Sequence, residues 1–483
     1  MDDRVWTSLL LLISVFSSSG QTLPDGAVAR IATAPGEPAF TGHIWTSLSP
    51  DGRTVAVADE AGRLDLWDLD GKRVTTLRTS GPGQSNPCWS PDGRRLFTSH
   101  PDGIAIWDLA KPVEPRVLPS GLKVTDNMSI AVSPDGKFVV ATWSNPMTVC
   151  WDADTGRERW RRHFNGPLRI SKDSRHVVRS EFGQRFNFFE AATGHEVSSL
   201  GPPLFMCRPT SNDSFVFSPD GRLLAVSFDG YVSVREAKTG AEAWCYWSRR
   251  DPISLLVFSP DGHWLAACVA GSTLLIWDAV MGEIVSERDS PGVVLTSIDF
   301  TPDGRRVLTA SSDGTAVLRD LAPVGLKPAD SWRALSEDGP TAYAGLWSLA
   351  RDQNGPATLR AKLPPIPRLG ERDLARLIDN LDSPRHAVRE RASRALNDQG
   401  RAAIQALQTA LTRTNSAESA ARLEKLIPAA DRGFTSQEIT HRRAVKAMSL
   451  AGTAEARELL AEWAAGAPGA VLTDEAKAAL GRR

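Results

Sequence analysis

The sequence is poor in the residues on which disulfide-stabilised and metal-binding proteins depend. It contains five cysteines and eight histidines among 483 residues. No CxxC motif or Cys/His spacing typical of a zinc site occurs, and we expect no metal and no cofactor. The odd number of cysteines, spread over separate segments, argues against a disulfide framework, so we expect small buried hydrophobic side chains. The five are Cys88, Cys150, Cys207, Cys245 and Cys268.

The sequence also lacks an excess of charge and a long apolar run. Its 56 basic residues are balanced by 57 acidic ones, which gives no general attraction to nucleic acid or to an anionic membrane. We therefore expect no nucleic-acid partner and no integral membrane span. The chain is too long for one compact core of the usual size, so two or more domains are expected.

Sequence motifs that carry catalysis are missing as well. The chain has no GxSxG motif, no P-loop, no HExxH motif and no kinase signature. A Ser/His/Asp site could be assembled only by folding, because the histidines are scattered. We therefore expect a protein that is not an enzyme.

The N-terminal residues 1–20 resemble a signal peptide. A short apolar run, Leu9–Phe16, precedes the small residues Ser17–Gly20, as in an h-region followed by a cleavage site. The positively charged start is missing, because acidic residues at positions 2 and 3 oppose the one arginine. We predict export to the periplasm or the extracellular space. If the segment is a misassigned start, the protein is cytoplasmic, and an uncleaved anchor is a further alternative.

One four-residue turn returns seven times along the chain, and it is the strongest signal in the sequence. Its copies begin at positions 49, 90, 133, 171, 218, 259 and 301, which gives spacings of 41, 43, 38, 47, 41 and 42 residues. Six copies read Ser/Thr-Pro-Asp-Gly, and the fourth, Ser171–Ser174, has lost its Pro and Gly. Asp-Gly suits a tight reversal because Asp caps the turn and Gly can take a positive φ. This period is typical of radial or solenoid repeats.

A second mark follows each turn after 17 or 18 residues. It is Trp-Asp in four of the repeats, at Trp67, Trp107, Trp151 and Trp277. Short apolar stretches before the turn, after it and at this mark read as strands, and a fourth strand follows. Four antiparallel strands per repeat form one propeller blade.

At these residues the chain resembles the WD40-repeat family, over residues 26–321. The resemblance implies an all-β seven-bladed propeller. A closed ring needs its last sheet completed by the other end of the chain, because open edges would stay unpaired. The seventh repeat ends after its third strand, and Gly26–Ala32 reads as a lone strand. We predict that this segment completes blade seven.

The chain departs from the family in its polar residues. The family's histidine, about ten residues before the turn, is absent from all seven repeats, and Arg235 and Arg319 replace tryptophan in repeats five and seven. We therefore expect apolar packing to hold the ring, with the polar network within the blades weak or absent.

From residue 322 the pattern changes to a separate all-α part. Residues 322–369 are predicted to be a Pro-rich linker with short helices, including one from Thr341 to Arg351. Apolar residues at three- and four-residue steps predict continuous helices over 370–483, with a capping box at Thr435–Glu438 and a stop at Gly452. This part resembles HEAT repeats, and an irregular helical bundle is the alternative. Its arginine cluster at 385–394 could attract an acidic surface or be a solvated face.

Two loops are the candidate interaction sites. The link before the fifth turn, Gly201–Asp213, is the longest and carries Phe205, Met206 and Arg208, which could dock a partner or cover the worn fourth blade. The next link has Trp247 beside Arg249 and Arg250, the composition of an interface hot spot, or a packed strand residue beside solvated arginines.

The sequence thus predicts a protein–protein interaction scaffold with an unidentified protein partner. The alternative is an exported ligand-binding module or enzyme, similar to TolB-like or quinoprotein propellers, which also use Pro-Asp-Gly turns. An enzyme would show charged residues from several blades converging at the centre of the ring, with strongly shifted pKa values.

Overall fold

The computed structural model forms two compact units. The first comprises Met1–Pro260, Leu265–Leu275 and Glu287–Leu321, and the second comprises Asp261–Trp264, Ile276–Ser286 and Ala322–Arg483. The residues that the structure describes are 27–31, 40, 43–78, 87–111, 114–121, 128–143, 147–164, 166–181, 185–200, 214–228, 230–237, 239–248, 251–323, 328–399, 403–431 and 435–481. The expected signal peptide lies outside them. The helices in the described residues are not long and apolar enough to cross a membrane.

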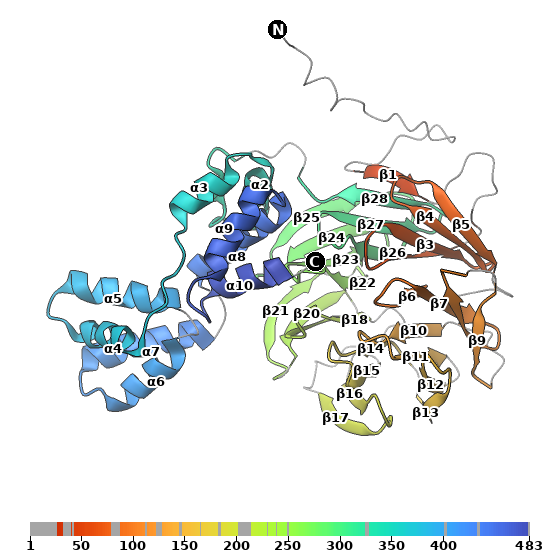
Figure 1. Cartoon of the computed structure of the whole chain (residues 1–483), viewed down its shortest axis with the longest axis horizontal. Helices are drawn as coiled ribbons and strands as arrows, with labels where there is room; N and C mark the ends of the chain where they lie inside the picture. Colours follow the sequence, from red (N-terminus) through yellow and green to blue (C-terminus); the bar gives the residue numbers. More distant parts are fainter. Residues whose placement is uncertain are drawn as a thin grey trace, which may run out of the picture. The chain divides into compact units, whose positions relative to one another are not determined.

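Seven four-stranded antiparallel sheets are arranged around a common axis, and the predicted seven-bladed propeller is confirmed (Figure 1). From inner to outer strand, the first sheet contains β2 Ile44–Leu48, β3 Thr54–Asp59, β4 Arg63–Asp68 and β5 Arg73–Arg78, and the second contains β6 Cys88–Trp89, β7 Arg95–His100, β8 Gly103–Asp108 and β9 Arg116–Pro119. The third sheet contains β10 Met128–Val132, β11 Phe138–Trp143, β12 Met147–Asp152 and β13 Glu158–Arg162. The fourth contains β14 Leu168–Ile170, β15 His176–Glu181, β16 Arg185–Glu190 and β17 Glu196–Leu200. The fifth and sixth are β18 Ser214–Phe217, β19 Leu223–Phe228, β20 Tyr231–Glu236 and β21 Glu242–Trp247; β22 Ile253–Phe258, β23 Trp264–Val269, β24 Thr273–Asp278 and β25 Ile284–Asp289.

The two ends of the propeller meet in the seventh sheet. It contains β26 Leu295–Phe300, β27 Arg306–Ser311, β28 Ala316–Asp320 and, as its outer strand, β1 Ala27–Ile31. β1 runs antiparallel to β28, with Ile31 opposite Ala316. The seam between the seventh and first sheets is further held by side chains, because the Thr46 hydroxyl lies 2.7 Å from that of Ser297. The predicted closure by the N-terminal strand is confirmed.

Six of the seven repeated turns share one described hydrogen-bond pattern. In the first, the Ser49 hydroxyl donates to Asp51 at 2.6 Å and accepts from the Thr54 amide. The worn fourth copy keeps the same bonds from Ser171 to Asp173. Its last residue, Ser174, has a positive φ of 58°, and the glycines at the same position of the other turns also have a positive φ. The turn therefore depends on the Ser and Asp side chains more than on Pro and Gly.

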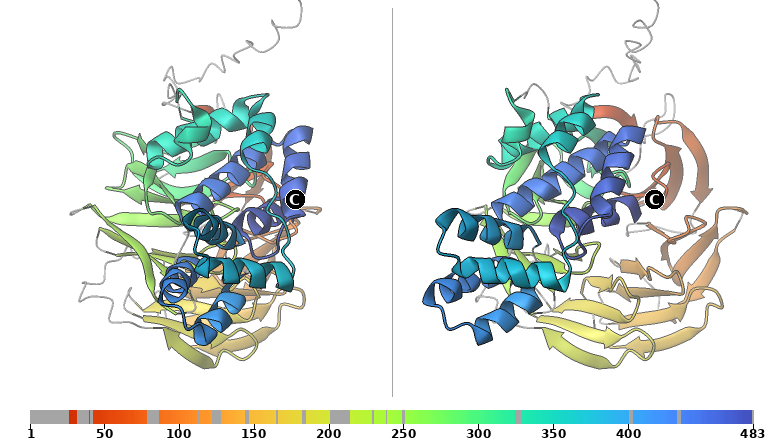
Figure 2. Two further views of the ribbon diagram at one scale, coloured as in Figure 1. Left: turned by 90° about the vertical axis from the view of Figure 1, so that its left-hand side faces the viewer. Right: turned by 60° about the vertical axis from the view of Figure 1, so that its left-hand side comes forward.

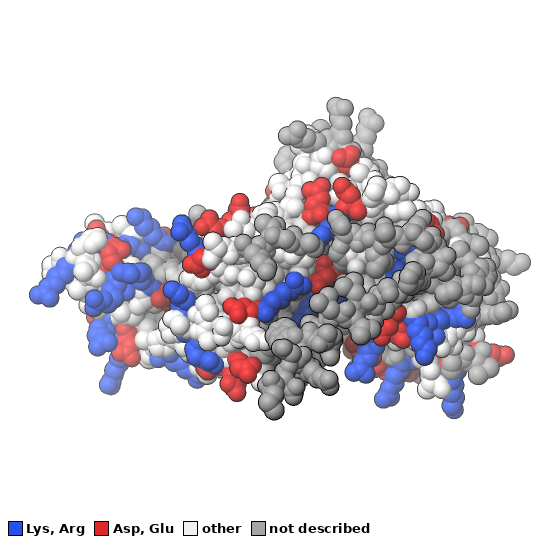
Figure 3. Space-filling view, turned by 90° about the horizontal axis from the view of Figure 1, so that it is seen from above, with Lys and Arg blue, Asp and Glu red and all other residues white. Residues whose placement is uncertain are grey.

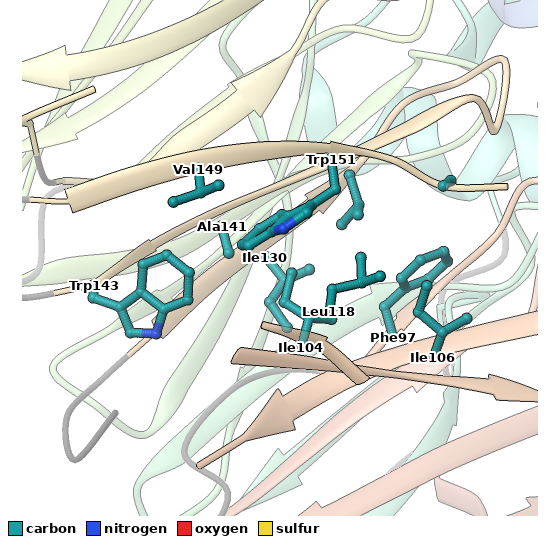
Figure 4. Packing of buried hydrophobic residues seen from close by; sticks show 11 residues of the cluster. Phe97, Ile104, Ile106, Leu118, Ile130, Ala141, Trp143, Val149 and Trp151 are labelled. Carbon is teal, nitrogen blue, oxygen red and sulfur yellow. The ribbon is translucent and has the colours of Figure 1, made fainter. Parts of the chain in front are cut away.

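Apolar side chains from neighbouring sheets fill the space between blades. Between the second and third sheets, Trp151 is buried beside Ile130 and Leu118, with the ring of Trp143 edge-on to it at 6.0 Å (Figure 4). Cys150 is buried against the fourth sheet, and burial raises the pKa of its thiol to about 12. The described cysteines form no disulfide bond with one another. The expectation of buried cysteines is wrong for Cys245, which is exposed.

The expectation of a weak or absent polar network is wrong for two blades. In the second sheet the indole N–H of Trp107 donates to the Thr98 hydroxyl at 3.1 Å. In the seventh, Arg319 is only 4% exposed and donates to the equivalent hydroxyl, that of Thr309, and to Ser290 at 2.9 Å. The guanidinium of Arg319 thus takes the place of the indole N–H of a tryptophan, and it donates to a second hydroxyl as well.

The second unit contains ten α-helices within the described residues, in agreement with the predicted helical region. They are α1 Ser331–Ala334, α2 Gly339–Arg351, α3 Gly355–Lys362, α4 Glu371–Asp379, α5 His386–Gln399, α6 Ile404–Arg413, α7 Ala417–Asp431, α8 Ser436–Ala451, α9 Ala454–Ala464 and α10 Val471–Gly481. α8 starts at the predicted capping box, in which Thr435 and Glu438 bond reciprocally, and ends at Gly452 with φ 66°. Figure 2 shows α8, α9 and α10 side by side. HEAT-like pairing of the helices stays a prediction.

Helices α4 to α7 share a small core of their own, which includes Leu396 and Leu407. Figure 3 shows many Lys and Arg side chains over these helices, with acidic ones among them. In the predicted arginine cluster, Arg389 donates to the Ser383 carbonyl at 2.7 Å and lies 3.4 Å from Glu418. These contacts favour the interpretation as a solvated, charge-interleaved face.

Three basic side chains of α8 contact acidic groups inside the second unit. Lys446, 1% exposed, pairs with Asp261, and its ammonium lies 5.6 Å from the ring centroid of Trp264. Arg443 lies 3.0 Å from Glu283, and Arg442 lies 3.0 Å from Glu475 on α10. Because Lys446 and Arg443 are buried, each of these two charges depends on its acidic partner.

Acid should destabilise the second unit through His441. This α8 side chain is 5% exposed, and burial lowers its pKa from 6.5 to about 4. The unfolded chain binds a proton below pH 6.5 that the folded chain resists, so stability is complete above pH 6.5 and is lost as pH falls toward 4, by roughly 3 kcal/mol. Urea unfolding at several pH values should show that the free energy of unfolding falls between pH 6.5 and 4. His441→Leu should remove this pH-dependent slope.

The exposed His386 provides the control for this prediction. Its side chain is 74% exposed, so His386→Leu should keep the wild-type slope between pH 6.5 and 4. Equal slopes in the wild type and in His441→Leu would contradict the prediction.

Candidate functional site

Of the six predicted interaction residues, one lies in the described part of the chain. Phe205, Met206, Arg208, Arg249 and Arg250 lie outside the described residues. Trp247 is the last residue of β21, the outer strand of the fifth sheet, and is 64% exposed. Trp247 is therefore a strand residue with a mostly exposed side chain, and its role at an interface stays a prediction.

β21 differs from the other outer strands in its composition. It reads Glu-Ala-Trp-Cys-Tyr-Trp, with three aromatic residues and one charge, and Cys245 and Trp247 are exposed on the same face. Outer strands usually carry charged residues that discourage pairing with other chains. An exposed indole on a weakly charged edge is a feature of protein interaction surfaces.

A second candidate site lies at the axis of the ring. The seven inner strands, β2, β6, β10, β14, β18, β22 and β26, form the innermost layer (Figure 1). Side chains two positions before each turn Ser or Thr are all partly exposed, whereas those three positions before are all buried. Since strand side chains alternate in direction, and each inner strand is covered by its own sheet and by neighbouring blades, we place the partly exposed position toward the axis. This level consists of Ser47, Cys88, Ala131, Arg169, Val216, Val257 and Asp299.

Arg169 and Asp299 are the two charged residues in the seven inner strands, and both occur at this level. The Arg169 guanidinium donates to the neighbouring Leu168 carbonyl at 2.8 Å and lies 5.7 Å from the ring centroid of Phe215. The Asp299 carboxylate accepts the Leu48 amide N–H at 3.2 Å. Both side chains keep some exposed surface although protein surrounds them on most sides, as expected for groups at a narrow axis.

Burial controls the ionisation of these groups. It raises the pKa of Asp299 to about 7, against a smaller lowering by the Leu48 N–H, and it lowers the pKa of Arg169. Burial also raises the pKa of the Cys88 thiol to about 12, so this thiol is uncharged at neutral pH. The charges of Arg169 and Asp299 both affect the Cys88 thiol, which places this residue within electrostatic reach of each.

The gathering of these seven inner-strand positions around the axis was not predicted from the sequence. A signal was available, because aligning the seven turns places Arg169 and Asp299 in one column otherwise filled by small or apolar residues. The feature predicted for the alternative function, charged residues from several blades converging at the centre with shifted pKa values, is met only in part, because two of the seven inner strands carry a charge.

Neutralising Asp299 should stabilise the protein at high pH. Its folded pKa of about 7 lies above its ordinary value of 3.8, so the folded chain holds a proton that the unfolded chain releases. The charge therefore costs stability above pH 7, and the cost disappears as pH falls toward 4. Asp299→Asn, which keeps an oxygen for the Leu48 N–H, should gain roughly 2–4 kcal/mol at pH 8 and nothing at pH 4. Denaturant unfolding at both pH values measures this, and a loss of stability at pH 8 would contradict it.

Two family models match the chain. The model described as "Outer membrane protein assembly factor BamB" matches residues 12–254. The model described as "WD domain, G-beta repeat" matches residues 248–278 and 285–320, in the sixth and seventh repeats. Within the described residues, no group of three or more His, Cys, Asp or Glu side chains could hold a metal ion.

Known relatives and a solved structure resemble the propeller part. The protein groucho of Drosophila melanogaster is 24% identical over 57% of this chain and 32% of its own length. An uncharacterized WD repeat-containing protein of Synechocystis is 26% identical over 30% of this chain and 40% of its own length. The guanine nucleotide-binding protein subunit beta of Arabidopsis thaliana is 20% identical over 56% of this chain and 79% of its own length. The chain therefore spans well under half the length of the first two.

The β-propeller domain of Cps50 (Swd1) from Myceliophteria thermophila has the same fold. It superposes with a TM-score of 0.52 at 16% identity and covers 61% of this chain and 99% of that domain. The solved structure shows the fold, whereas the family is shown by the model described as "Outer membrane protein assembly factor BamB", which matches about half of the chain. The chain therefore belongs to the family that this model describes, and it is a seven-bladed β-propeller with WD40 repeats and a C-terminal helical region.

Proposed function

We propose that this protein is a non-enzymatic scaffold for protein–protein interaction, and that its propeller presents the outer strand β21, with the links before and after the fifth sheet, to a protein partner. The observation that carries the proposal is the 64% exposed Trp247 on an edge strand rich in aromatic residues. A relative such as a guanine nucleotide-binding protein subunit beta is, by its name, part of an assembly, which supports this class of function. The partner is a protein that buries an indole.

The test compares the full-length protein with two single variants. Trp247→Ala removes the exposed indole, and Val74→Ala removes an exposed valine from β5, the outer strand of the first sheet, where Val74 is 61% exposed. In affinity capture, proteins retained by the wild type and by Val74→Ala should fall at least tenfold with Trp247→Ala. Equal retention by all three would overturn the role of β21.

The remaining predicted residues enter the same experiment. We include Phe205, Met206 and Arg208 in one triple alanine variant, and Arg249 and Arg250 in another, as proposed contributors to the surface. If the surface extends along both links, each variant should weaken retention of the same proteins. If both alanine variants retain the partner proteins as the wild type does, the interaction surface is limited to β21.

A ligand-binding module is the second candidate function, and the charges of Arg169 and Asp299 at the axis favour it. Export of the protein, as the N-terminal segment suggests, would fit either function. The two functions do not exclude each other, because the axis and the outer strands are different parts of the ring.

A further inference from the structure

The axis of the ring holds one positive and one negative side chain that do not neutralise each other. Arg169 belongs to the fourth sheet and Asp299 to the seventh, three blades apart in a ring of seven. The interactions described for Arg169 are with the Leu168 carbonyl and the face of Phe215. The interaction described for Asp299 is with the Leu48 amide. Each charge therefore lacks an ionic partner among the described residues.

Maintaining two such charges is unfavourable for folding alone. Buried charges cost free energy unless they are paired, and the fold offers uncharged solutions at the same level, where Ala131, Val216 and Val257 occupy the equivalent positions. The Asp299 carboxylate does contribute one hydrogen bond across the seam between the seventh and first sheets. An asparagine would make that bond as well, so the seam does not explain the charge.

The rest of the level is suited to a small ligand and adds no further charge. Ser47 can donate or accept a hydrogen bond, Cys88 is neutral, and the three other positions are small or apolar. A molecule lying across the axis would meet a guanidinium on one side and a carboxylate on another, with apolar contacts between them. Sites of this kind, apolar with a few fixed polar groups, are typical of small-molecule binding.

We propose that the axis of the propeller binds a small zwitterion, whose carboxylate is held by Arg169 and whose ammonium is held by Asp299. Guanidinium and carboxylate groups match in geometry and form two parallel hydrogen bonds, so Arg169 fixes one end. The ammonium donates to the Asp299 carboxylate, which needs its ionised form. Such a ligand neutralises both charges at once, whereas a simple acid or amine leaves one unpaired.

The first experiment measures binding of ω-amino acids to the full-length protein by calorimetry. The probes are 3-aminopropanoate, 4-aminobutanoate and 6-aminohexanoate, with butanoate and butylamine as singly charged controls. We expect saturable binding of at least one amino acid, at least tenfold tighter than either control. No saturable binding of any amino acid at millimolar concentration, or equal binding of butanoate, would overturn the proposal.

Variants of the full-length protein test which side chain binds each end of the ligand. Arg169→Gln and Asp299→Asn should each weaken binding at least tenfold, whereas Lys137→Gln, which removes an exposed turn charge, should leave it within about twofold. Asp299→Asn is expected to be at least as stable as the wild type, so its loss of binding cannot result from unfolding. Binding unchanged in both axis variants would overturn the proposal.

The pH dependence provides an independent readout. The titratable groups of the seven inner strands are Arg169, Asp299 and Cys88, and only Asp299 changes its charge near neutrality. Binding should therefore tighten as pH rises from 6 to 8 in the wild type and be insensitive to pH in Asp299→Asn. The opposite trend in the wild type would overturn the assignment of the ammonium. A peptide ending in lysine is the last probe, and tighter binding of this peptide than of every free amino acid would overturn the assignment to a free small molecule.

Discussion

Replacing Ile31 by serine should destabilise the propeller by about 3–5 kcal/mol. Ile31 is fully buried in the cluster between the seventh and first sheets, with Ile44, Val55 and Leu318 as neighbours. The substitution removes most of a buried aliphatic side chain, which alone costs roughly 2–5 kcal/mol, and places a hydroxyl among apolar groups. Since β1 is the strand that completes the last sheet, the substitution weakens the contacts that close the ring. Denaturant unfolding followed by tryptophan fluorescence measures it.

Val28 provides the control within the same strand. It lies where the register of β1 shifts and is 46% exposed, so Val28→Ser should change the unfolding midpoint little. A chain starting at residue 33 should show a larger effect than Ile31→Ser and should self-associate, because β28 then becomes an open edge. A truncated chain with the wild-type midpoint and no association would show that β1 does not close the ring.

Replacing Lys446 by methionine should destabilise the second unit by about 3–5 kcal/mol. The methionine fills a similar volume but leaves Asp261, whose side chain is 10% exposed, without its ion-pair partner. Removing one partner of a buried ion pair usually costs more free energy than the pair itself contributes. The ammonium also contacts the ring of Trp264, an interaction that methionine replaces only in part. Chemical unfolding monitored by helical circular dichroism gives the change.

An exposed pair of the same unit and a double variant complete this prediction. Arg360 and Glu462 form an ion pair 2.8 Å long with both side chains about two-fifths exposed, so Arg360→Met should have little effect. Adding Asp261→Asn to Lys446→Met should recover much of the lost stability, because the buried carboxylate disappears while the side-chain oxygen that accepts the His263 amide N–H remains. Equal effects of Lys446→Met and Arg360→Met, or no recovery in the double variant, would contradict the prediction.

Features that depend on neighbouring residues could be predicted from the sequence. The turns are one example, because Ser49 and Asp51 are close in the chain and bond to each other in the folded protein. The capping box at Thr435 and the stop at Gly452 are others. Repetition extended this local information to the whole ring, since seven equal units and one spare strand, β1, allow a single closed arrangement. The number of sheets and the partner of β1 therefore followed from the sequence.

Only the tertiary structure decided which distant residues share one environment. Arg169 and Asp299 are 130 positions apart, and closure of the ring brings their inner strands, β14 and β26, around one axis. Arg319 interrupts a tryptophan pattern, but its burial shows that a guanidinium can donate to Thr309 as an indole does to its own partner. Lys446 is buried beside Asp261, a residue 185 positions earlier in the chain. Burial and pairing of charges depend on the fold as a whole, whereas turns and caps depend on a few consecutive residues.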